Sequence, residues 1–247
     1  MVQPLTKSAG SRLEASRLET MQRDHAVSKT PALLRAMIQQ EFAGRIAVVS
    51  SFGAESAVLL HLVAEIDPST PVLFLNTGKL FGETLRYRDR LQDLLGLTDL
   101  RAIGPHPKDR AAQDPEGRLW SKNPDACCNF RKTVPLARAM EGFDAWITGR
   151  KRFQTDDRAS MNAIEMVGAR YRINPLADWS QADLERYMVE HHLPPHPLVR
   201  DGYLSIGCMS CTSRVKEGED ARSGRWRGQD KTECGIHLDG FTDGGGI

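Results

Sequence analysis

The hydrophobic positions of the chain form short continuous runs separated by longer stretches with helical spacing. Short continuous apolar runs are typical of strands that are buried on both faces of a sheet. The stretches between them repeat their apolar residues every three to four positions, as an amphipathic helix does. We expect strands at Arg45–Ser51, Val72–Leu75, Thr98–Ile103 and Asp144–Thr148, and helices at Ala57–Ile66, Glu83–Leu95 and Cys127–Met140.

Strands that alternate with helices predict an α/β fold, in which a mostly parallel, twisted sheet carries helices on both faces. Thr30-Pro31 is typical of a helix start, with Thr30 as the capping residue, and Gly44 is placed to end that helix. The alternation over Ile164–Ile173 predicts a hairpin. Ser180 and Asp183 form the capping box of a further helix, which ends near His191.

Three regions are expected from these patterns. Residues 1–30 are polar and form an N-terminal arm, which is either extended or a loosely held helix, and residues 31–211 form the α/β domain. Within that domain, the stretch Gly104–Pro124 is rich in proline, glycine and charge, which predicts a loop. Residues 212–247 are charged and glycine-containing without a core pattern, which predicts a flexible C-terminal tail.

Composition excludes some classes of partner. The 247 residues carry 33 basic and 32 acidic side chains, so a net charge of +1 draws the chain neither to nucleic acid nor to a membrane surface. No apolar run reaches the length of a membrane span. The first thirty residues lack the apolar stretch and cleavage pattern of a secretory signal, so we expect a cytoplasmic protein in a reducing compartment.

The five cysteines suggest a metal centre and a reactive thiol. Cys127 and Cys128 are adjacent, and Cys208 and Cys211 form a second close pair roughly eighty residues later. Four thiolates fill a tetrahedral sulfur site of the zinc or the iron–sulfur kind, and buried structural thiols are the alternative. Cys234 lies apart from both pairs, near the end of the chain.

Polar or glycine-rich loops follow three of the expected strands. These loops are Ser51–Ser56, Asn76–Lys79 and Gly149–Arg158. In parallel sheets the ligand crevice lies outside the carboxyl ends of the strands, so the three loops are expected to converge. The first loop leads into a helix start, where backbone N–H groups and the helix dipole favour phosphate or sulfate. It lacks the GK[ST] of a Walker loop.

The motifs SSFGAES, LNTGKLFGET, CC, WITGRKRFQT, PLADWSQADLERYM, HPLVRDGYLSIGCMSCT and ECGIHL together identify a family. From about residue 40 to His237 the chain resembles the assimilatory adenylyl-sulfate (APS) and phosphoadenylyl-sulfate (PAPS) reductases. That resemblance implies the adenine nucleotide alpha hydrolase-like, or PP-loop, version of the α/β fold. The two cysteine pairs resemble those of the subgroup that carries a [4Fe–4S] cluster and mainly uses APS.

The resemblance implies a mechanism and a reductant. The Cys234 thiolate attacks the sulfur of the APS sulfate, which releases AMP and leaves a Cys-thiosulfonate intermediate. Thioredoxin or a glutaredoxin then frees sulfite, in assimilatory sulfate reduction for cysteine biosynthesis. Residues 31–211 hold the nucleotide and the cluster, and the tail 212–247 carries the catalytic cysteine. Family members are commonly dimers or tetramers, so the sequence leaves a homo-oligomer open.

The resemblance and the loops together predict the site residues. Lys132 resembles the family lysine between cluster and substrate, and Arg222 and Arg225 match arginines that close over the substrate. Phe52 replaces a glycine of related loops, and its bulk favours a small anionic group over a triphosphate. The catalytic residue is Cys234, and the metal ligands are Cys127, Cys128, Cys208 and Cys211. The substrate-binding residues are Ser51, Phe52, Gly53, Glu55, Ser56, Asn76, Thr77, Gly78, Lys132, Arg150, Arg152, Arg222 and Arg225.

Three alternatives stay open at this point. A PAPS reductase, or an enzyme with dual activity, would require a basic pocket for the 3′-phosphate. A PP-loop ATP pyrophosphatase that transfers sulfur would use a similar sheet, but it would leave Cys234 unexplained. A non-enzymatic zinc- or cluster-binding module would not explain the anion-binding loops.

Overall fold

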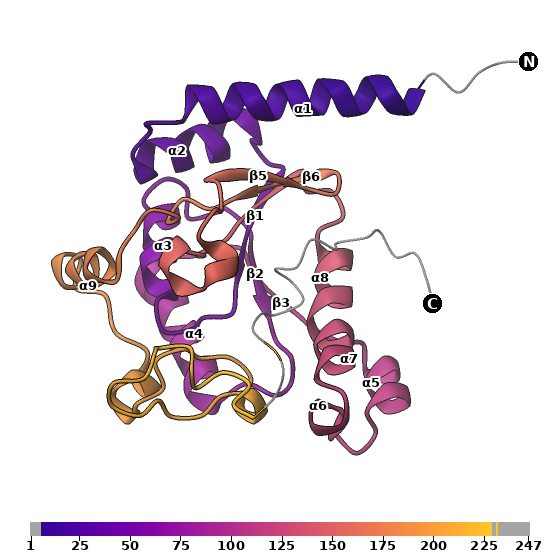
Figure 1. The fold of residues 1–247 in the computed structure, drawn as a ribbon, viewed down its shortest axis with the longest axis vertical. Helices are drawn as coiled ribbons and strands as arrows, with labels where there is room; N and C mark the ends of the chain where they lie inside the picture. The colour runs from indigo at the N-terminus through magenta and orange to yellow at the C-terminus, as the bar shows by residue number, and fades with distance from the viewer. Residues whose placement is uncertain (1–5, 229–230, 232–247) are drawn as a thin grey trace, which may run out of the picture.

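The computed structural model describes residues 6–228 and residue 231. Within this part of the chain, one sheet of six strands has the order β3-β2-β1-β4-β6-β5 (Figure 1). Neighbouring strands run parallel, except that β5 is antiparallel to β6. The strands are β1 (Ile46–Ser50), β2 (Val72–Leu75), β3 (Leu100–Ile103), β4 (Ala145–Ile147), β5 (Ile164–Val167) and β6 (Arg170–Ile173). The mostly parallel sheet and the hairpin predicted over Ile164–Ile173 are both confirmed.

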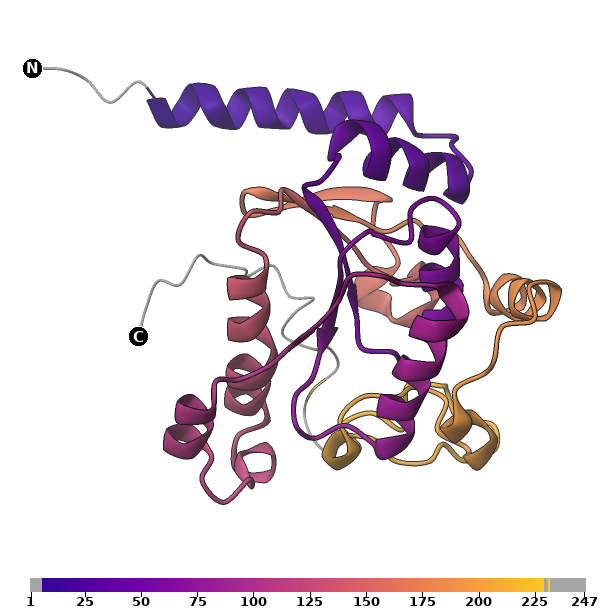
Figure 2. The ribbon, with the colours of Figure 1, turned by 180° about the vertical axis from the view of Figure 1, so that it is seen from behind.

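Helices cover both faces of the sheet, as predicted. Figures 1 and 2 show α3 and α4 on one face and α8 on the other. α7 and α8 are joined by a π-helical turn, so the predicted helix over Cys127–Met140 is one continuous helical segment. The helices are α1 (Thr6–Asp24), α2 (Thr30–Ala36), α3 (Ser56–Ala64), α4 (Gly82–Leu95), α5 (Pro107–Gln113), α6 (Leu119–Lys122), α7 (Pro124–Cys128), α8 (Val134–Ala139) and α9 (Gln181–Glu190).

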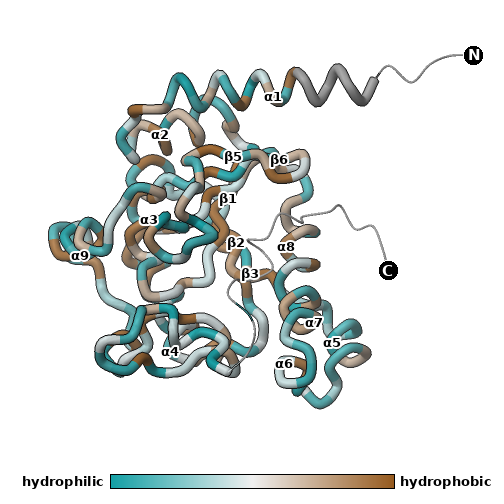
Figure 3. The backbone as a smooth tube through the Cα atoms, in the orientation of Figure 1, coloured by the Kyte–Doolittle hydropathy of each residue, from teal (hydrophilic) through white to brown (hydrophobic). Residues whose placement is uncertain are grey.

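The core lies on both sides of the sheet, which explains why the strand sequences are continuously apolar. Along β1, Ile46 and Val48 belong to the hydrophobic cluster under α2 and α3, whereas Ala47 belongs to the cluster under α8. Successive side chains of a strand point to opposite faces, so a strand covered on both sides needs an apolar residue at every position. Figure 3 shows the same contrast, with hydrophobic strands at the centre and hydrophilic helices α5, α6 and α9 at the periphery.

Two local predictions were wrong. Thr30 does not cap α2, because its hydroxyl donates to the carbonyl of Pro175 (2.9 Å) and accepts from the indole of Trp179 (2.8 Å). Lys29 is the N-cap residue instead. The region Gly104–Pro124 is not only a loop, because it contains α5 and α6. The capping box of α9 is confirmed, since Ser180 and Asp183 bond each other's backbone N–H.

The N-terminal region forms a helix, one of the two possibilities that the sequence left open, whereas one expectation for the C-terminal region is corrected. In the N-terminal region, α1 contacts β5, and the Gln22 amide donates to the carbonyl of Ile164 (2.8 Å). After Cys211, residues 212–228 were expected to lack core contacts, yet Trp226 is 3% exposed and belongs to the cluster under α8. That expectation is therefore corrected for residues 212–228. None of the helices in the described ranges is both long enough and apolar enough to cross a bilayer.

A buried ion pair links the peripheral helices to the sheet. Arg131, in the turn between α7 and α8, pairs with Asp114 at 2.6 Å, and both side chains are almost fully buried. The same guanidinium donates to the carbonyl of Thr77, just after β2, at 2.7 Å. Burial alone would raise the pKa of Asp114, but hydrogen bonds from Arg131 and the backbone of Leu119 lower that pKa below its ordinary value.

Removing one charge of this pair should be costly. We expect Asp114→Asn to lower the free energy of unfolding by about 3–5 kcal/mol, because it leaves the Arg131 charge buried without its counter-charge. Asp99→Asn is the matched control, since its ion pair with Arg101 is partly exposed and is worth at most about 1 kcal/mol. Urea unfolding of the two variants measures the difference. Equal losses would contradict the assigned role of Asp114.

A buried histidine makes stability depend on pH. The ring of His196 accepts the Leu198 N–H at Nδ1 (3.2 Å) and lies 3.1 Å from the Thr84 hydroxyl at Nε2. Burial lowers the pKa of His196 to about 4, against a small opposing effect of Glu83. The folded state therefore favours the neutral ring, and the unfolded state binds the proton more readily.

We expect this contribution to be complete above about pH 6.5 and to fall by about 3 kcal/mol as the pH decreases towards 4. His196→Asn keeps a hydrogen-bond acceptor but cannot titrate in this range. Urea unfolding of the parent and the variant at several pH values tests the expectation. The parent should lose stability more steeply than His196→Asn on acidification, and parallel profiles would show that His196 is not responsible.

Candidate active site at the carboxyl ends of the parallel strands

A pocket of about 220 Å³ opens where the parallel strands β1, β2 and β4 end. All three loops that were expected to converge contribute to its wall, as do the segment Leu204–Cys208 and the turn Asp220–Trp226. Among the described residues, six basic and two acidic side chains line the pocket, which gives it an excess of positive charge. The basic ones are Lys132, Arg150, Lys151, Arg158, Arg222 and Arg225, and the acidic ones are Glu55 and Asp220.

The loop between β1 and α3 forms one wall. Ser51, Gly53, Glu55 and Ser56 line the pocket at the N-terminus of α3, where the helix dipole favours an anion. A Cβ atom at Gly53 would lie 3.2 Å from the carbonyl of Ile206, so a glycine at this position lets two walls of the pocket approach closely.

Phe52 does not line the pocket, contrary to prediction. Its backbone is left-handed (φ 51°), and this conformation turns the fully buried side chain into the core, against the edge of Phe74. Its N–H donates to the Ser50 hydroxyl at 3.1 Å. The bulk of Phe52 therefore does not limit the size of an anion in the pocket. The predicted preference for a small anionic group over a triphosphate loses its basis.

The loop after β2 contributes one of its three predicted residues. Thr77 lines the pocket, and its hydroxyl lies 3.2 Å from the sulfur of Cys208. Asn76 and Gly78 instead shape the turn, because the Asn76 side chain accepts the Gly78 N–H at 3.2 Å and Gly78 has a positive φ of 68°. These two residues support Thr77 and do not face the pocket.

The loop after β4 supplies a buried lysine that is not in the predicted set of site residues. Lys151 is 3% exposed and forms an ion pair with Glu55 of the opposite loop. Burial lowers the pKa of Lys151, and the Glu55 carboxylate opposes this effect. Gln154 also donates to Glu55 (3.2 Å) and accepts a hydrogen bond from Arg158. Sequence reasoning preferred Arg150 and Arg152 because nothing in the sequence pairs Lys151 with Glu55.

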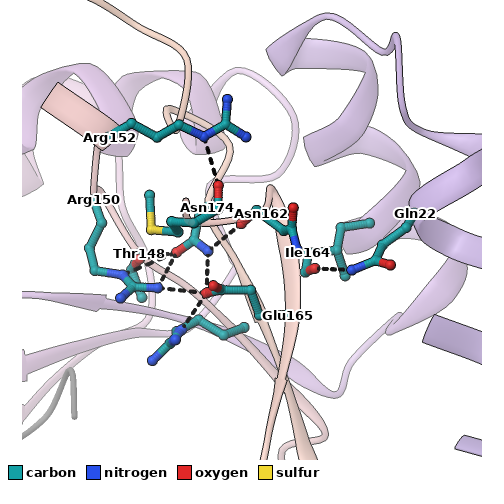
Figure 4. Close-up of polar contacts among 10 residues, drawn as sticks. Gln22, Thr148, Arg150, Arg152, Asn162, Ile164, Glu165 and Asn174 are labelled. Atoms are coloured by element: carbon teal, nitrogen blue, oxygen red, sulfur yellow. Dashed lines mark hydrogen bonds and ion pairs between the residues drawn. The ribbon is translucent and has the colours of Figure 1, made fainter. Parts of the chain in front are cut away.

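Arg150 lines the pocket, but its guanidinium belongs to a buried network (Figure 4). It pairs with Glu165 (2.7 Å) and contacts the Asn174 side chain (3.2 and 3.3 Å). Glu165 also pairs with Arg172 on the same edge hairpin (2.9 Å). Burial lowers the pKa of Arg150 to about 10, and the nearby Arg172 charge adds to this effect. The network fixes the end of β4 relative to β6.

Arg152 lies outside the pocket, unlike the prediction. Its Nε donates to the carbonyl of Met161 (2.7 Å), and its guanidinium pairs with Asp178. The 3-10 turn Arg152–Gln154 directs it towards that part of the chain (Figure 4). Its predicted role in binding phosphate or sulfate therefore has no support from its position.

The two cysteine pairs come together beside the pocket. Cys127 and Cys128 are buried at the end of α7, Cys208 is buried in the pocket wall, and Cys211 is partly buried. Burial raises the pKa of the Cys127 thiol, the Arg131 charge opposes this effect, and the thiols of Cys208 and Cys211 add to it. No three His, Cys, Asp or Glu side chains within the described residues are grouped as a single metal ion would require.

Lys132 and the two tail arginines complete the positive wall. Lys132 is buried, lines the pocket and lies four positions after Cys128 on the same helical segment. Arg222 and Arg225 line the pocket from the turn that precedes Trp226. Cys234 lies outside the described residues. Lys231, three positions before it in the sequence, forms an ion pair with Asp125 at the start of α7.

The sequence is similar to known reductases of activated sulfate. The family model described as the phosphoadenosine phosphosulfate reductase domain matches residues 45–214. The adenosine 5′-phosphosulfate reductase of Mesorhizobium japonicum is 56% identical over 209 residues, which cover 85% of this chain and 82% of that protein. The adenosine 5′-phosphosulfate reductase of Streptomyces coelicolor is 41% identical, over 80% of this chain and 84% of that protein.

Solved structures show the same fold. The phosphoadenylyl-sulfate (PAPS) reductase from Candida auris, in a phosphate complex, superposes with a TM-score of 0.68 at 23% identity and covers 80% of this chain and 96% of that one. The FMN adenylyltransferase of Candida glabrata has a TM-score of 0.55 at 16% identity, over 87% of this chain and 76% of that one. The family match and the identities of the relatives carry the conclusion that this chain belongs to the phosphoadenosine phosphosulfate reductase family.

Proposed function

We propose that this enzyme reduces adenylyl sulfate to sulfite and AMP, with electrons from thioredoxin or a glutaredoxin. The observation that carries the proposal is the positively charged pocket beside two cysteine pairs, in a chain with relatives named adenosine 5′-phosphosulfate reductase. A substrate with one phosphate and one sulfate group matches a pocket whose basic side chains outnumber its acidic ones. Reduction by a dithiol protein requires a reducing compartment, so the proposal includes a cytoplasmic enzyme.

The proposed reaction has two stages, and each begins with the attack of a thiolate on a sulfur atom. The Cys234 thiolate forms a bond to the sulfate sulfur, and the bond from that sulfur to the phosphate oxygen breaks, so AMP leaves. A thiolate of the reductant then attacks the Cys234 sulfur, and sulfite departs with the electron pair of the S–S bond. The second thiol of the reductant releases Cys234 as a thiolate and closes a disulfide. Sulfur goes from S(VI) to S(IV), and the dithiol supplies both electrons.

The residues of the pocket have distinct tasks in this proposal. Lys132, Arg222 and Arg225 hold the negatively charged sulfate and phosphate groups, and they offset the repulsion between the substrate and an approaching thiolate. Lys151 and Glu55 fix the loop after β1 against the loop after β4. The N-terminus of α3 favours negative charge at the same place.

The four cysteines fit a [4Fe–4S] cluster by the chemistry of their donors. Cys127, Cys128, Cys208 and Cys211 are all thiols, three of them are buried, and they gather from two distant parts of the sequence. A single tetrahedral zinc ion would need sulfurs about 3.8 Å apart, given a Zn–S bond of about 2.3 Å. The preference for the cluster over zinc rests on the resemblance of the two cysteine pairs to those of the cluster-carrying subgroup. A bound cluster would stabilise the region around the four cysteines and would contribute to the electrostatic potential of the pocket. The cluster would keep the same oxidation state throughout the reaction.

The reaction should depend on Cys234. We expect Cys234→Ser to lower the rate of sulfite formation from adenylyl sulfate and thioredoxin by a factor on the order of 1,000 or more, because serine is not a nucleophile at neutral pH without an activating base. Parallel assays with phosphoadenylyl sulfate and with ATP separate the alternatives. Sulfite release from the variant near the parent rate, or ATP hydrolysis without sulfite formation, would contradict the proposal.

The metal proposal has its own test. We expect the anaerobically purified protein to contain about four iron atoms per chain, as a [4Fe–4S] cluster requires. Cys208→Ser should lose most of this iron, whereas Cys234→Ser, the matched control, should keep it. Iron and acid-labile sulfide analysis measures both. An active protein without iron, or zinc in place of iron in the parent, would overturn the cluster assignment without affecting the role of Cys234.

A further inference from the structure

Trp226 is an aromatic residue in a charged segment, and the two arginines before it in the pocket wall lie against its ring. The Cζ atom of Arg225 is 4.3 Å from the ring centroid, and that of Arg222 is 5.9 Å away. Trp226 is 3% exposed and packs into the hydrophobic cluster under α8. The ring therefore connects the core of the domain to two basic side chains that line the pocket.

The backbone around Trp226 is held in an unusual conformation. Trp226 has a φ of 49°, in the left-handed region that a bulky side chain rarely adopts. Its N–H donates to the carbonyl of Cys211 (3.1 Å), and Arg225 forms an isolated bridge with Thr212. Such a conformation persists where the surrounding structure imposes it, and it concentrates at functional sites. Here the segment that contains Cys208 and Cys211 imposes it.

The other side of Arg225 is also defined. A Cβ atom at Gly207 would lie 2.5–2.7 Å from the three terminal atoms of the Arg225 guanidinium, so this group lies flat against the Gly207 backbone. Arg225 is thus enclosed between the Trp226 ring and the residue that precedes Cys208. An arginine side chain has many rotamers in solution, and an arginine held in this way has already lost most of that freedom before a ligand binds.

A third cation reaches the same ring. Lys231 Nζ lies 5.9 Å from the Trp226 centroid, and this lysine also pairs with Asp125, two positions before Cys127. An aromatic face attracts a cation without cancelling its charge, unlike a carboxylate. The ring can therefore orient several basic side chains without itself neutralising their charge.

We propose that Trp226 is a positioning residue for substrate binding, which holds Arg222 and Arg225 in the orientation that binds the sulfate and phosphate groups of the substrate. This inference rests on the proposed function, because it takes adenylyl sulfate as the ligand. It adds a residue that does not donate a hydrogen bond to the anion but acts through the two arginines. It also makes anion binding depend on the position of the Cys208–Cys211 segment.

The test compares Trp226→Leu with Trp226→Phe in the Cys234→Ser protein, in which no turnover of the substrate is expected. Calorimetric titration measures the Kd for adenylyl sulfate. We expect Trp226→Leu to weaken binding about 10-fold or more, because leucine is apolar but has no aromatic face. Trp226→Phe should restore binding to within about 3-fold of the parent, because it keeps an aromatic face. Iron content and thermal unfolding are measured for each protein.

Tyr203→Leu is the matched control. Arg214 lies over the Tyr203 ring, with Cζ 5.7 Å from the centroid, in the same C-terminal part of the chain, but neither residue lines the pocket. Removal of this aromatic face should leave the Kd unchanged. Equal weakening by Tyr203→Leu and Trp226→Leu would contradict a specific role for Trp226, as would a Phe variant that binds as poorly as the Leu variant.

If Trp226→Leu does not fold, a second experiment tests the same role of the Trp226 ring. Fluorinated tryptophans keep the shape of the indole but withdraw electron density from its face, which weakens the attraction for cations. Biosynthetic incorporation of mono- and difluorotryptophan should raise the Kd stepwise in a chain with Trp226, and should have no such effect in the Trp226→Phe chain. A Kd that is independent of fluorination in both chains would overturn the proposal.

Gly207→Ala perturbs Arg225 from the side that faces the Gly207 backbone. The added methyl group would displace the Arg225 guanidinium, and it should weaken binding although Trp226 is intact. Two failures are distinguishable in these experiments. If the parent Cys234→Ser protein does not bind adenylyl sulfate, the proposed function is wrong. If the parent binds and both Trp226→Leu and Gly207→Ala bind equally well, only the role of Trp226 is wrong.

Discussion

Burial of positive charge at one edge of the sheet is the constraint on which the rest of this structure depends. A basic group removed from water costs several kcal/mol unless a counter-charge or hydrogen bonds compensate it. The chain buries several such groups near the carboxyl ends of its strands, and three carboxylates compensate four of them. Asp114 pairs with Arg131, Glu55 pairs with Lys151, and Glu165 pairs with both Arg150 and Arg172. The Glu55–Lys151 pair joins two pocket loops that are 96 positions apart in the sequence, so at this pair compensation of charge also assembles the pocket.

Carboxylates and aromatic rings give different results as partners of a cation. A carboxylate fixes the cation and cancels much of its field, which suits Arg150 as a brace between β4 and the edge hairpin. The Trp226 ring contacts Arg222 and Arg225 in the pocket wall and does not itself neutralise their charge. The site therefore has two sets of basic residues. One set forms ion pairs within the frame, and the other lies against the Trp226 ring in the pocket wall.

The sequence was sufficient for the sheet and insufficient for the orientation of side chains. Continuous apolar runs predict the strands because burial on both faces requires an apolar residue at every position. Phe52 was misplaced because a positive φ, which no local pattern announces, turns its side chain into the core. Lys151 was left out of the predicted site because its partner Glu55 is 96 positions away in the sequence. Trp226 was overlooked because a single aromatic residue in a charged segment shows no periodicity. The helices α5 and α7 did have a local signal, since Pro107 and Pro124 lie at their first positions.

The segment Cys208–Cys211 and the pocket are held by the same neighbouring residues, so a movement of this segment would change the pocket. Thr77 lines the pocket and contacts the Cys208 sulfur, while Arg131 holds the Thr77 carbonyl and Trp226 holds the carbonyl of Cys211. A shift of the Cys208–Cys211 segment would move a polar group of the pocket and the support of two arginines at the same time. Because packed interiors resist small displacements, a rigid group bound to the four cysteines would fix both. A metal centre that exchanges no electrons with the substrate would in this way still determine how well the pocket binds it.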